Sequence, residues 1–485
     1  MKRRVFLKNH VIQTKNSNSV NTNLDSFLRA VLSLPRVQTT IKLMSLHQEL
    51  KDRGIVYQVT DPAIEAHLSE KEMRTLYCGF DPTADSLHVG SLFPLLTLRR
   101  FQEAGHRPIV VLGGATGMIG DPSFKAQERS LQTPEQVAHN LKGIRAVAEK
   151  FLDFTPGKPN AALIVNNHDF YSGMNVLDFL REVGKYFTVN HMMGKDSVRA
   201  RMEDRDQGIS YTEFSYSLLQ AYDFYCLYQK SNCTIQIGAS DQWGNIVAGT
   251  DLIRRKLAHE SEATQPTANE KPAASFAFGL THPLITKSDG TKFGKSESGS
   301  VWLSAEKTSA YQLYQFFISS PDDSVILWLN YLTFLTVTEI QALAEKVKTE
   351  PEKKAAQIAL ARAVTCLVHG DTALARAEAA TKALFGTEIK DLDLATLNEV
   401  FADTPSTEKK LEDVGAGLPL IDLLAETGLF QSKGAARKEI PAGGVYVNNE
   451  RVTDVAYTVN THHLIAGSAV VIRKGKKNYH VVKFK

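Results

Sequence analysis

The sequence contains little that would mark a membrane protein or a disulfide-stabilised one. It has no run of ~18 uncharged apolar residues, the length that a membrane-spanning helix needs. Only four cysteines are present, and no two of them form a C-x-x-C pair. This excludes a disulfide scaffold and a cysteine-based zinc site, and it is typical of a reducing compartment. The 56 Lys and Arg nearly balance the 53 Asp and Glu, so any nucleic-acid-binding surface must be local.

The length of 485 residues corresponds to about three domains at ~150 residues each. A composition of 43% hydrophobic and 22% charged residues is typical of a folded globular protein. The sequence predicts an N-terminal extension (1–43), an α/β domain (44–303) with a polar insertion (257–275), a helical domain (304–402), a linker (403–417) and a small C-terminal domain (418–485).

The first 43 residues have a composition of their own. They contain eight Lys and Arg but one acidic residue, Asp25, with a Ser/Asn/Thr cluster near residues 14–23. This composition fits a mitochondrial transit peptide, although the Arg-rich amphipathic pattern is missing. The alternative is an upstream extension without a role, because Met44 opens a plausible start of its own. We expect a cytoplasmic protein, with the mitochondrial matrix as the alternative.

Strand-like and helix-like segments alternate between residues 74 and 238. Apolar runs at 74–80, 107–114, 161–167 and 233–238 predict strands, and the segments 90–104, 134–152, 175–186 and 211–228 predict helices. Strands this apolar indicate a parallel sheet covered on both faces, as in a Rossmann-like α/β fold. Ligands of such sheets bind beyond the carboxyl ends of the strands, so candidate functional residues should follow each strand.

The first candidate motif is LYCGFDPTADSLHVGS (76–91). It could be a plain strand–turn–helix connection in which Pro82 and Gly90 shape the turn. It could also be a phosphate site, in which Thr83 and His88 donate to a polyphosphate beside a helix N-terminus. Gly90 would then let a nucleotide approach the backbone closely.

The second motif is SDGTKFGKSESGS (288–300), in which Lys292 and Lys295 lie among glycines. Such lysines are either a solvated face or point charges that close over phosphates. The Walker A pattern fails, because Gly290 and Gly294 enclose three residues instead of four. The segment GGATGMIG (113–120) likewise lacks the G-x-G core of a dinucleotide-binding motif.

The third motif is TEFSYSLLQAYDF (212–224), which places Tyr216, Gln220 and Asp223 on one face of a predicted helix. These could be one core tyrosine and two exposed polar residues. Because the helix is otherwise apolar, they could equally line a polar pocket suited to an ammonium group and hydroxyls. The two interpretations are evenly balanced on this motif alone.

Five segments, in their order along the chain, resemble tyrosyl-tRNA synthetases of the bacterial type, which are class I aminoacyl-tRNA synthetases. The segments are YCGFDPTADSLHVGS, GGATGMIGDPS, SYTEFSYSLLQAYDF, SDQWGN and DGTKFGKS. HVGS stands in place of the HIGH signature of this class, and KFGKS in place of KMSKS. The resemblance extends from about Met44 to Lys485.

The resemblance implies a tyrosine pocket, an ATP site and a set of mobile cations. For tyrosine it implies the hydroxyl-binding pair Tyr77 and Asp223, and an ammonium cradle of Asp121, Tyr216 and Gln220 with Asn167 nearby. For ATP it implies contacts from Cys78, Gly79, His88, Gly90, Ser91, Asp241, Gln242 and Lys295. For catalysis it implies Thr83 and His88 at the γ-phosphate and Lys125, Arg129, Lys292 and Lys295 on the leaving pyrophosphate.

The implied reaction has two steps. The carboxylate of tyrosine attacks the α-phosphate of ATP, and a ribose hydroxyl of the 3′-terminal adenosine of tRNA(Tyr) then takes the tyrosyl group. Because the substrate brings its own nucleophile, orientation and charge stabilisation suffice, and Mg²⁺ would travel with the phosphates without a dedicated protein site. A pocket that forms hydrogen bonds to a hydroxyl rejects phenylalanine, because the polar groups of the pocket would be left unpaired. Tyrosyl-tRNA synthetases are the standard example of this rule. We therefore expect no editing domain.

Three features depart from the family pattern. Ser91 replaces the usual second histidine, Ala239 replaces the second glycine of GGSDQ, and the 257–275 insertion is longer than expected. None of these changes removes a charged group, so we expect an active enzyme.

The C-terminal segment (418–485) has ten Lys and Arg against five Asp and Glu. It resembles an S4-type RNA-binding domain of two short helices and a β-ribbon, although Pro441 interrupts the second helix. Lys433, Arg437 and Lys438 would contact tRNA phosphates, while the RKGKK run (473–477) could equally be a solubilising surface. The family also implies a homodimer.

Two other functions remain open on the sequence. Tryptophanyl-tRNA synthetases share the class, but an indole offers one donor and does not need the donor–acceptor pair of Tyr77 and Asp223. A synthetase-derived RNA-binding or splicing protein without catalysis is the other. Asp121, His88 and the lysines of the second motif argue against it.

Overall fold

The computed structural model describes residues 45–121, 132–194, 198–199, 202, 209–262, 276–286, 293–296, 299–385, 389–390, 392–401, 404–475 and 478–485. The chain divides into two units, Met1–Ser45 and Leu46–Lys485, and the fold that follows is that of the second. No helix of the described part is both long and apolar enough to cross a membrane.

A six-stranded sheet forms the first part of this unit. Its strand order is β1-β6-β5-β2-β3-β4, parallel throughout except for the antiparallel edge strand β1. The strands are β1 (Gln58–Val59), β2 (Thr75–Phe80), β3 (Arg107–Leu112), β4 (Leu163–Asn166), β5 (Cys233–Ala239) and β6 (Phe278–His282). The four predicted strands and their parallel pairing are confirmed. The pair β1 and β6 was not predicted, because both are short and β6 contains glycine and polar residues.

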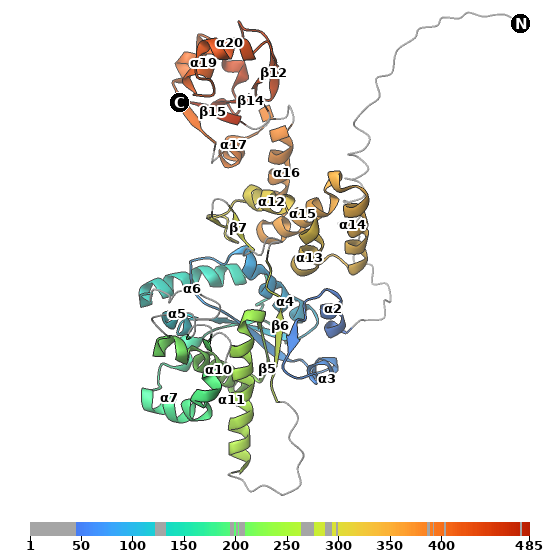
Figure 1. Ribbon diagram of the computed structural model, residues 1–485, viewed down its shortest axis with the longest axis vertical. Helices are drawn as coiled ribbons and strands as arrows, with labels where there is room; N and C mark the ends of the chain where they lie inside the picture. Colours follow the sequence, from blue (N-terminus) through green and yellow to red (C-terminus); the bar gives the residue numbers. More distant parts are fainter. Residues whose placement is uncertain are drawn as a thin grey trace, which may run out of the picture. The chain divides into compact units, whose positions relative to one another are not determined.

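Helices cover both faces of this sheet, as expected for strands this apolar. They are α2 (Leu46–Asp52), α3 (Ile64–Ser69), α4 (Leu92–Glu103), α5 (Thr116–Ile119), α6 (Pro134–Ala148), α7 (Val176–Glu182), α8 (Val189–Met193), α10 (Tyr211–Ser231) and α11 (Trp243–Glu262). Tyr77 of β2 packs with Phe224 of α10 and Ile253 of α11, whereas Leu76 packs with the core on the α4 side. Figure 1 shows α10 and α11 side by side next to β5.

Local sequence signals explain where the long helix α10 begins and ends. The hydroxyl of Ser210 accepts a hydrogen bond from the backbone N–H of Glu213, which caps the first turn. Asn232 ends the helix with a left-handed backbone (φ 49°) and leads directly into β5. Three residues of this helix, Tyr216, Gln220 and Asp223, lie near the carboxyl end of β2.

Helix α11 continues to Glu262, so the first residues of the insertion predicted at 257–275 are helical. Leu257 belongs to the apolar cluster between α10 and α11, which explains why the helix persists there. Residues 263–275 lie outside the described residues.

The predicted helical domain consists of α12 (Ala310–Ile318), α13 (Asp322–Leu332), α14 (Val337–Thr349), α15 (Ala355–His369) and α16 (Asp371–Phe385). Capping boxes begin α12 at Ser309 and α14 at Thr336. The buried side chains of Phe317 and Trp328 belong to the same core as α4, so these helices are continuous with the sheet domain.

The C-terminal part is a five-stranded sheet of order β12-β11-β14-β15-β9 with two short helices on one face. Its elements are α17 (Leu394–Val400), β9 (Ser406–Lys409), α18 (Leu411–Gly415), β10 (Leu418–Pro419), α19 (Leu420–Glu426), α20 (Lys433–Glu439), β11 (Val445–Val447), β12 (Glu450–Val452), β13 (Thr458–Val459), β14 (Ala469–Lys474) and β15 (Asn478–Phe484). The segment predicted as a linker is therefore structured: β9 pairs in parallel with β15. Phe401, which the sequence assigns to the end of the helical domain (304–402), packs on the other face of this sheet.

Candidate active site

A cavity of about 550 Å³ lies beyond the carboxyl ends of β2 and β5. This is the point at which the strand order reverses, where sheets of this type bind ligands. The predicted tyrosine and ATP residues that line it are Tyr77, Cys78, Gly79, Thr83, His88, Gly90, Ser91, Asp121, Asn167, Tyr216, Gln220, Asp223, Asp241 and Gln242. Residues far apart in the sequence thus line one cavity.

The deepest part of the cavity contains Tyr77 and Asp223, which are 2% and 3% exposed. The hydroxyl of Tyr77 is buried and has no hydrogen-bond partner among the described residues. Asp223 accepts hydrogen bonds from the Asn167 amide (2.9 Å) and from the Tyr171 hydroxyl (2.8 Å). Burial raises the pKa of Asp223 from 3.8 to about 7, although both of these hydrogen bonds lower it. A buried donor without a partner beside a buried carboxylate fits a ligand hydroxyl.

The sequence predicts Asn167 near the ammonium cradle; its amide donates both to Asp223 (2.9 Å) and to Thr116 (3.1 Å), which in turn donates to Asp81. The cause is local: Asn167 begins the short helix η2 (Asn167–Phe170) directly after β4, which directs its amide towards α10. Its side-chain oxygen accepts from the backbone N–H of Ala115 (2.7 Å), which fixes its orientation.

The middle of the cavity is a hydrogen-bonded set of carboxylates and amides. The Tyr216 hydroxyl donates to Asp81 (3.0 Å), and Thr116 donates to the other oxygen of Asp81 (2.8 Å). Gln242 donates to Asp121 (2.7 Å) and accepts from Gln220 (3.3 Å). Two carboxylates in so polar a setting suit a cationic group such as an ammonium.

Asp81 and Thr116 were not predicted as site residues. Asp81 follows β2 directly within the FDPTAD segment, and this position was the signal that could have identified it. Three other lining residues come from β5 and β6: Gln236 from the middle of β5, Ala239 from its end and His282 from the end of β6. Burial lowers the pKa of His282 to about 4, so its ring is neutral.

The mouth of the cavity is formed by the two signature motifs. His88 caps the short helix η1 (Val89–Ser91), and its Nδ1 accepts from the backbone N–H of Gly90 (3.0 Å). A Cβ atom at Gly90 would lie 2.7 Å from the His88 ring, so any other residue would displace that ring. Gly294 of the second motif lies against Val89 with φ 86°.

Most of the cationic residues that the sequence predicts for the site lie outside the residues that the structure describes. Lys125, Arg129 and Lys292 are not among the described residues. Lys295 begins strand β7 (Lys295–Ser296), which pairs with β8 (Gly299–Ser300), but its side chain is not described. No group of three or more potential metal ligands occurs among the described residues.

Cys78 lines the cavity but is no nucleophile. Burial raises the pKa of its thiol to about 12, so it stays protonated at neutral pH.

Two surfaces away from the cavity also carry predicted or notable residues. On α20, Arg437 and Lys438 are exposed, while Lys433 forms an ion pair with Asp422 (2.9 Å). On the other surface, large apolar side chains are exposed on three neighbouring helices that share one apolar cluster: Val176 and Leu177 of α7, Val189 of α8 and Tyr211 of α10.

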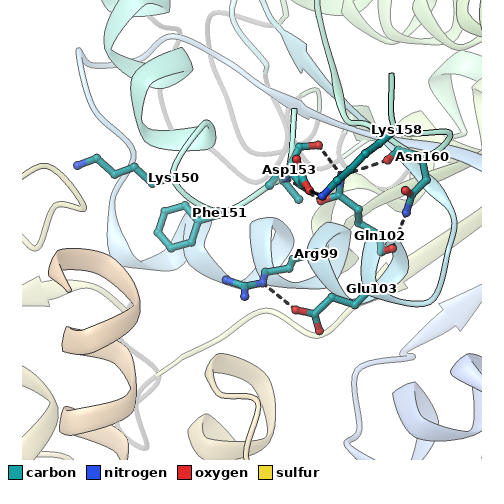
Figure 2. A pocket seen from close by; sticks show the side chains of 9 residues that line it. Arg99, Gln102, Glu103, Lys150, Phe151, Asp153, Lys158 and Asn160 are labelled. Atoms are coloured by element: carbon teal, nitrogen blue, oxygen red, sulfur yellow. Dashed lines mark hydrogen bonds and ion pairs between the residues drawn. The ribbon is translucent and has the colours of Figure 1, made fainter. Parts of the chain in front are cut away.

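A second cavity, of about 460 Å³, lies between the end of α4 and the segment that follows α6 (Figure 2). Two ion pairs lie in its wall, Arg99 with Glu103 and Lys158 with Asp153. Gln102 holds this segment through the backbone of Asp153 (Figure 2). No predicted site residue lies there.

Comparison with known proteins agrees with this geometry. The chain matches the family "tRNA synthetases class I (W and Y)" over residues 69–386 and the "Tyrosine--tRNA ligase SYY-like C-terminal domain" over residues 396–482. It is 50% identical to a tyrosine–tRNA ligase of Opitutus terrae and 49% identical to that of Geobacillus stearothermophilus. Each match covers 91% of this chain and 100% of the relative.

A solved structure also has the same fold. The C-terminally truncated mitochondrial tyrosyl-tRNA synthetase of Aspergillus nidulans superposes with a TM-score of 0.60 at 28% identity, covering 76% of this chain and 99% of that one.

Proposed function

This chain belongs to the tyrosine–tRNA ligases of the class I synthetases, and we propose that the cavity beyond β2 and β5 holds tyrosine and ATP during both steps of that reaction. The enzyme joins tyrosine to ATP, giving tyrosyl-adenylate and pyrophosphate, and then transfers tyrosine to the 3′-terminal adenosine of tRNA(Tyr). The tryptophan alternative is not favoured, because the relatives at about 50% identity are tyrosine–tRNA ligases.

The observation that carries this assignment of the cavity is the buried hydroxyl of Tyr77, which lies beside Asp223 and has no hydrogen-bond partner in the part of the chain that the structure describes. A substrate hydroxyl placed between them accepts from Tyr77 and donates to the Asp223 carboxylate. Phenylalanine would leave both groups unpaired in a buried site, which is costly. The free energy that favours tyrosine over phenylalanine therefore comes from Tyr77 and Asp223, which are positioned before the substrate binds.

The substrate ammonium belongs in the carboxylate set of the middle cavity. Asp121 reaches it from the segment after α5, and Tyr216 and Gln220 reach it from α10. Asp81 orients Tyr216 by accepting a hydrogen bond from its hydroxyl, so the Tyr216 oxygen keeps its lone pairs for the ammonium. This arrangement leaves the substrate carboxylate directed towards the mouth, where ATP enters.

ATP binds at the mouth, over Gly90 and beside His88, with Cys78, Gly79, Ser91, Asp241 and Gln242 in reach of its ribose and phosphates. No group of the protein needs to act as a nucleophile, because the substrate carboxylate attacks the α-phosphate. Thr83 and His88 stabilise the γ-phosphate, while Lys125, Arg129, Lys292 and Lys295 hold the leaving pyrophosphate. Mg²⁺ enters as part of the substrate, since it binds through phosphates and keeps several waters.

The tRNA-binding surface includes α20, with Lys433, Arg437 and Lys438 near the phosphates. The exposed apolar side chains of α7, α8 and α10 form the interface of a homodimer, because neighbouring large apolar groups on a surface mark an interaction site. We place the enzyme in the cytoplasm. Localising a fluorescent protein fused to residues 1–43 tests this, and import into mitochondria would establish the matrix instead.

Isolation of the adenylate tests the proposed function. The enzyme is incubated with MgATP and radiolabelled tyrosine without tRNA, and then passed through a gel-filtration column. We expect label to elute with the protein and to pass to tRNA(Tyr) when it is added. A folded enzyme that retains no label, or retains it equally with labelled phenylalanine, would contradict the assignment. Asp223→Ala is the matched negative control.

A further inference from the structure

The Asp223 carboxylate accepts hydrogen bonds from residues at both ends of the short helix η2. Helix η2 follows β4 directly; it begins at Asn167, and Tyr171 is its C-terminal capping residue. Asn167 donates to Oδ2 of Asp223 and Tyr171 donates to Oδ1, so each carboxylate oxygen accepts one hydrogen bond from η2. Each oxygen retains a lone pair for the cavity.

The Tyr171 hydroxyl has a second acceptor. Its oxygen lies 2.8 Å from the carbonyl oxygen of Leu219 and 2.8 Å from Oδ1 of Asp223. A hydroxyl has one proton, and the stronger hydrogen bond goes to the charged acceptor. The proton is therefore given to Asp223 while that carboxylate is ionised, and to Leu219 when it is not.

We propose that Tyr171 is a specificity-determining positioning residue, whose hydroxyl fixes the ionised Asp223 carboxylate in the orientation that accepts the hydroxyl of substrate tyrosine. This inference rests on the proposed function of the cavity. Tyr171 itself does not touch the substrate: its ring packs against Tyr222 (5.6 Å between centroids) and Phe179 (6.5 Å), away from the cavity lining.

Other groups also face Asp223 and set its charge. Asp81, after β2, raises its pKa, and Asn167 and Tyr171 lower it. Tyr77 of β2 and Tyr216 and Cys226 of α10 interact with the same carboxylate as neutral groups at neutral pH, because burial raises the pKa of each. Among the described residues, Tyr171 is thus one of two side chains whose hydrogen bonds favour the ionised form.

The test is Tyr171→Phe, which keeps the ring and removes the hydroxyl. Tyrosine-dependent pyrophosphate exchange is measured from pH 5.5 to 9 at saturating MgATP. A hydrogen bond to a charged group is worth ~1.5–3 kcal/mol, and 1.36 kcal/mol is one pKa unit, so the acid limb of kcat/KM for tyrosine should move up by about one to two pH units. We expect kcat at saturating tyrosine to change little.

The matched control is Tyr222→Phe. It makes the same change in the adjacent ring, and the Tyr222 hydroxyl engages Cys226 instead of Asp223. The ratio of kcat/KM for tyrosine to that for phenylalanine is taken from each sample, so it does not depend on the folded fraction. We expect it to fall about tenfold near pH 7 in Tyr171→Phe and to stay at the wild-type value in Tyr222→Phe.

Three results would overturn the inference. An acid limb and a selectivity ratio in Tyr171→Phe equal to the wild type would show that the hydroxyl does not act on Asp223. Equal losses in both variants would show a general disturbance of the aromatic cluster. A wild-type enzyme without tyrosine-dependent exchange would instead refute the proposed function, and this inference with it.

Discussion

Replacing Tyr77 with phenylalanine should stabilise the free enzyme while weakening its action on tyrosine. The Tyr77 ring is 2% exposed and packs against Phe224 at 5.2 Å between centroids, a contact that phenylalanine keeps. What is lost is a buried hydroxyl with no partner among the described residues. An unsatisfied buried polar group costs about 1–3 kcal/mol, so we expect the free energy of unfolding to rise by about 1 kcal/mol.

The same substitution removes one hydrogen bond to the substrate. A neutral hydrogen bond is worth about 1 kcal/mol net, so kcat/KM for tyrosine should fall roughly fivefold, with that for phenylalanine unchanged. Thermal unfolding with and without tyrosine, together with pyrophosphate exchange, measures both effects. Tyr216→Phe is the matched control, because its hydroxyl does have a partner, Asp81, and its loss should destabilise the free enzyme.

A less stable Tyr77→Phe enzyme with unchanged kcat/KM for tyrosine would refute this reasoning. It would mean that the Tyr77 hydroxyl has a structural partner instead of a substrate role.

Four further outcomes follow from the same geometry. Asp223→Ala should lower kcat/KM for tyrosine by about 10- to 100-fold in exchange, because it removes a charge-assisted hydrogen bond; unchanged activity would contradict the hydroxyl pocket. In the wild type, kcat/KM for tyrosine should fall as the pH drops through about 7, the raised pKa of Asp223. Because the pKa of Asp223 is higher in the folded state than its ordinary value of 3.8, protonation of Asp223 should raise the free energy of unfolding as the pH falls from 7 to 4. Unfolding of the enzyme at pH 6 would contradict this raised pKa. Lys295→Ala should slow adenylate formation in single-turnover kinetics and leave tyrosine affinity nearly intact, and a large loss of affinity would mean that the loop assignment is wrong. Leu177→Asp, at a side chain 68% exposed, should convert the proposed dimer into folded monomers in analytical ultracentrifugation, and a dimer of wild-type stability would exclude this interface.

The sheet and the cavity were predictable because their signals are local. Each of the four predicted strands is a short apolar run, and parallel pairing brings the residues after β2 and β5 to one edge. Tyr216, Gln220 and Asp223 lie on one face of α10 through helical spacing alone, and the structure places all three at the cavity.

What the sequence did not reveal depends on contacts between distant segments. Asn167 follows an apolar strand, but only the turn of η2 directs its amide towards Asp223. Tyr171 carries no motif, and its importance appears only when its hydroxyl is found 2.8 Å from a carboxylate 52 positions away. The sequence predicts a linker at β9, because its four residues are polar; they form a strand only by pairing with β15.

The central claim is that this cavity selects tyrosine by its hydroxyl. The most direct measurement is pyrophosphate–ATP exchange by the wild-type enzyme, without tRNA, with each of the twenty amino acids in turn. We predict exchange with tyrosine and at most a trace with phenylalanine. Comparable rates with the two, exchange with tryptophan instead, or silence from a folded enzyme would contradict the account.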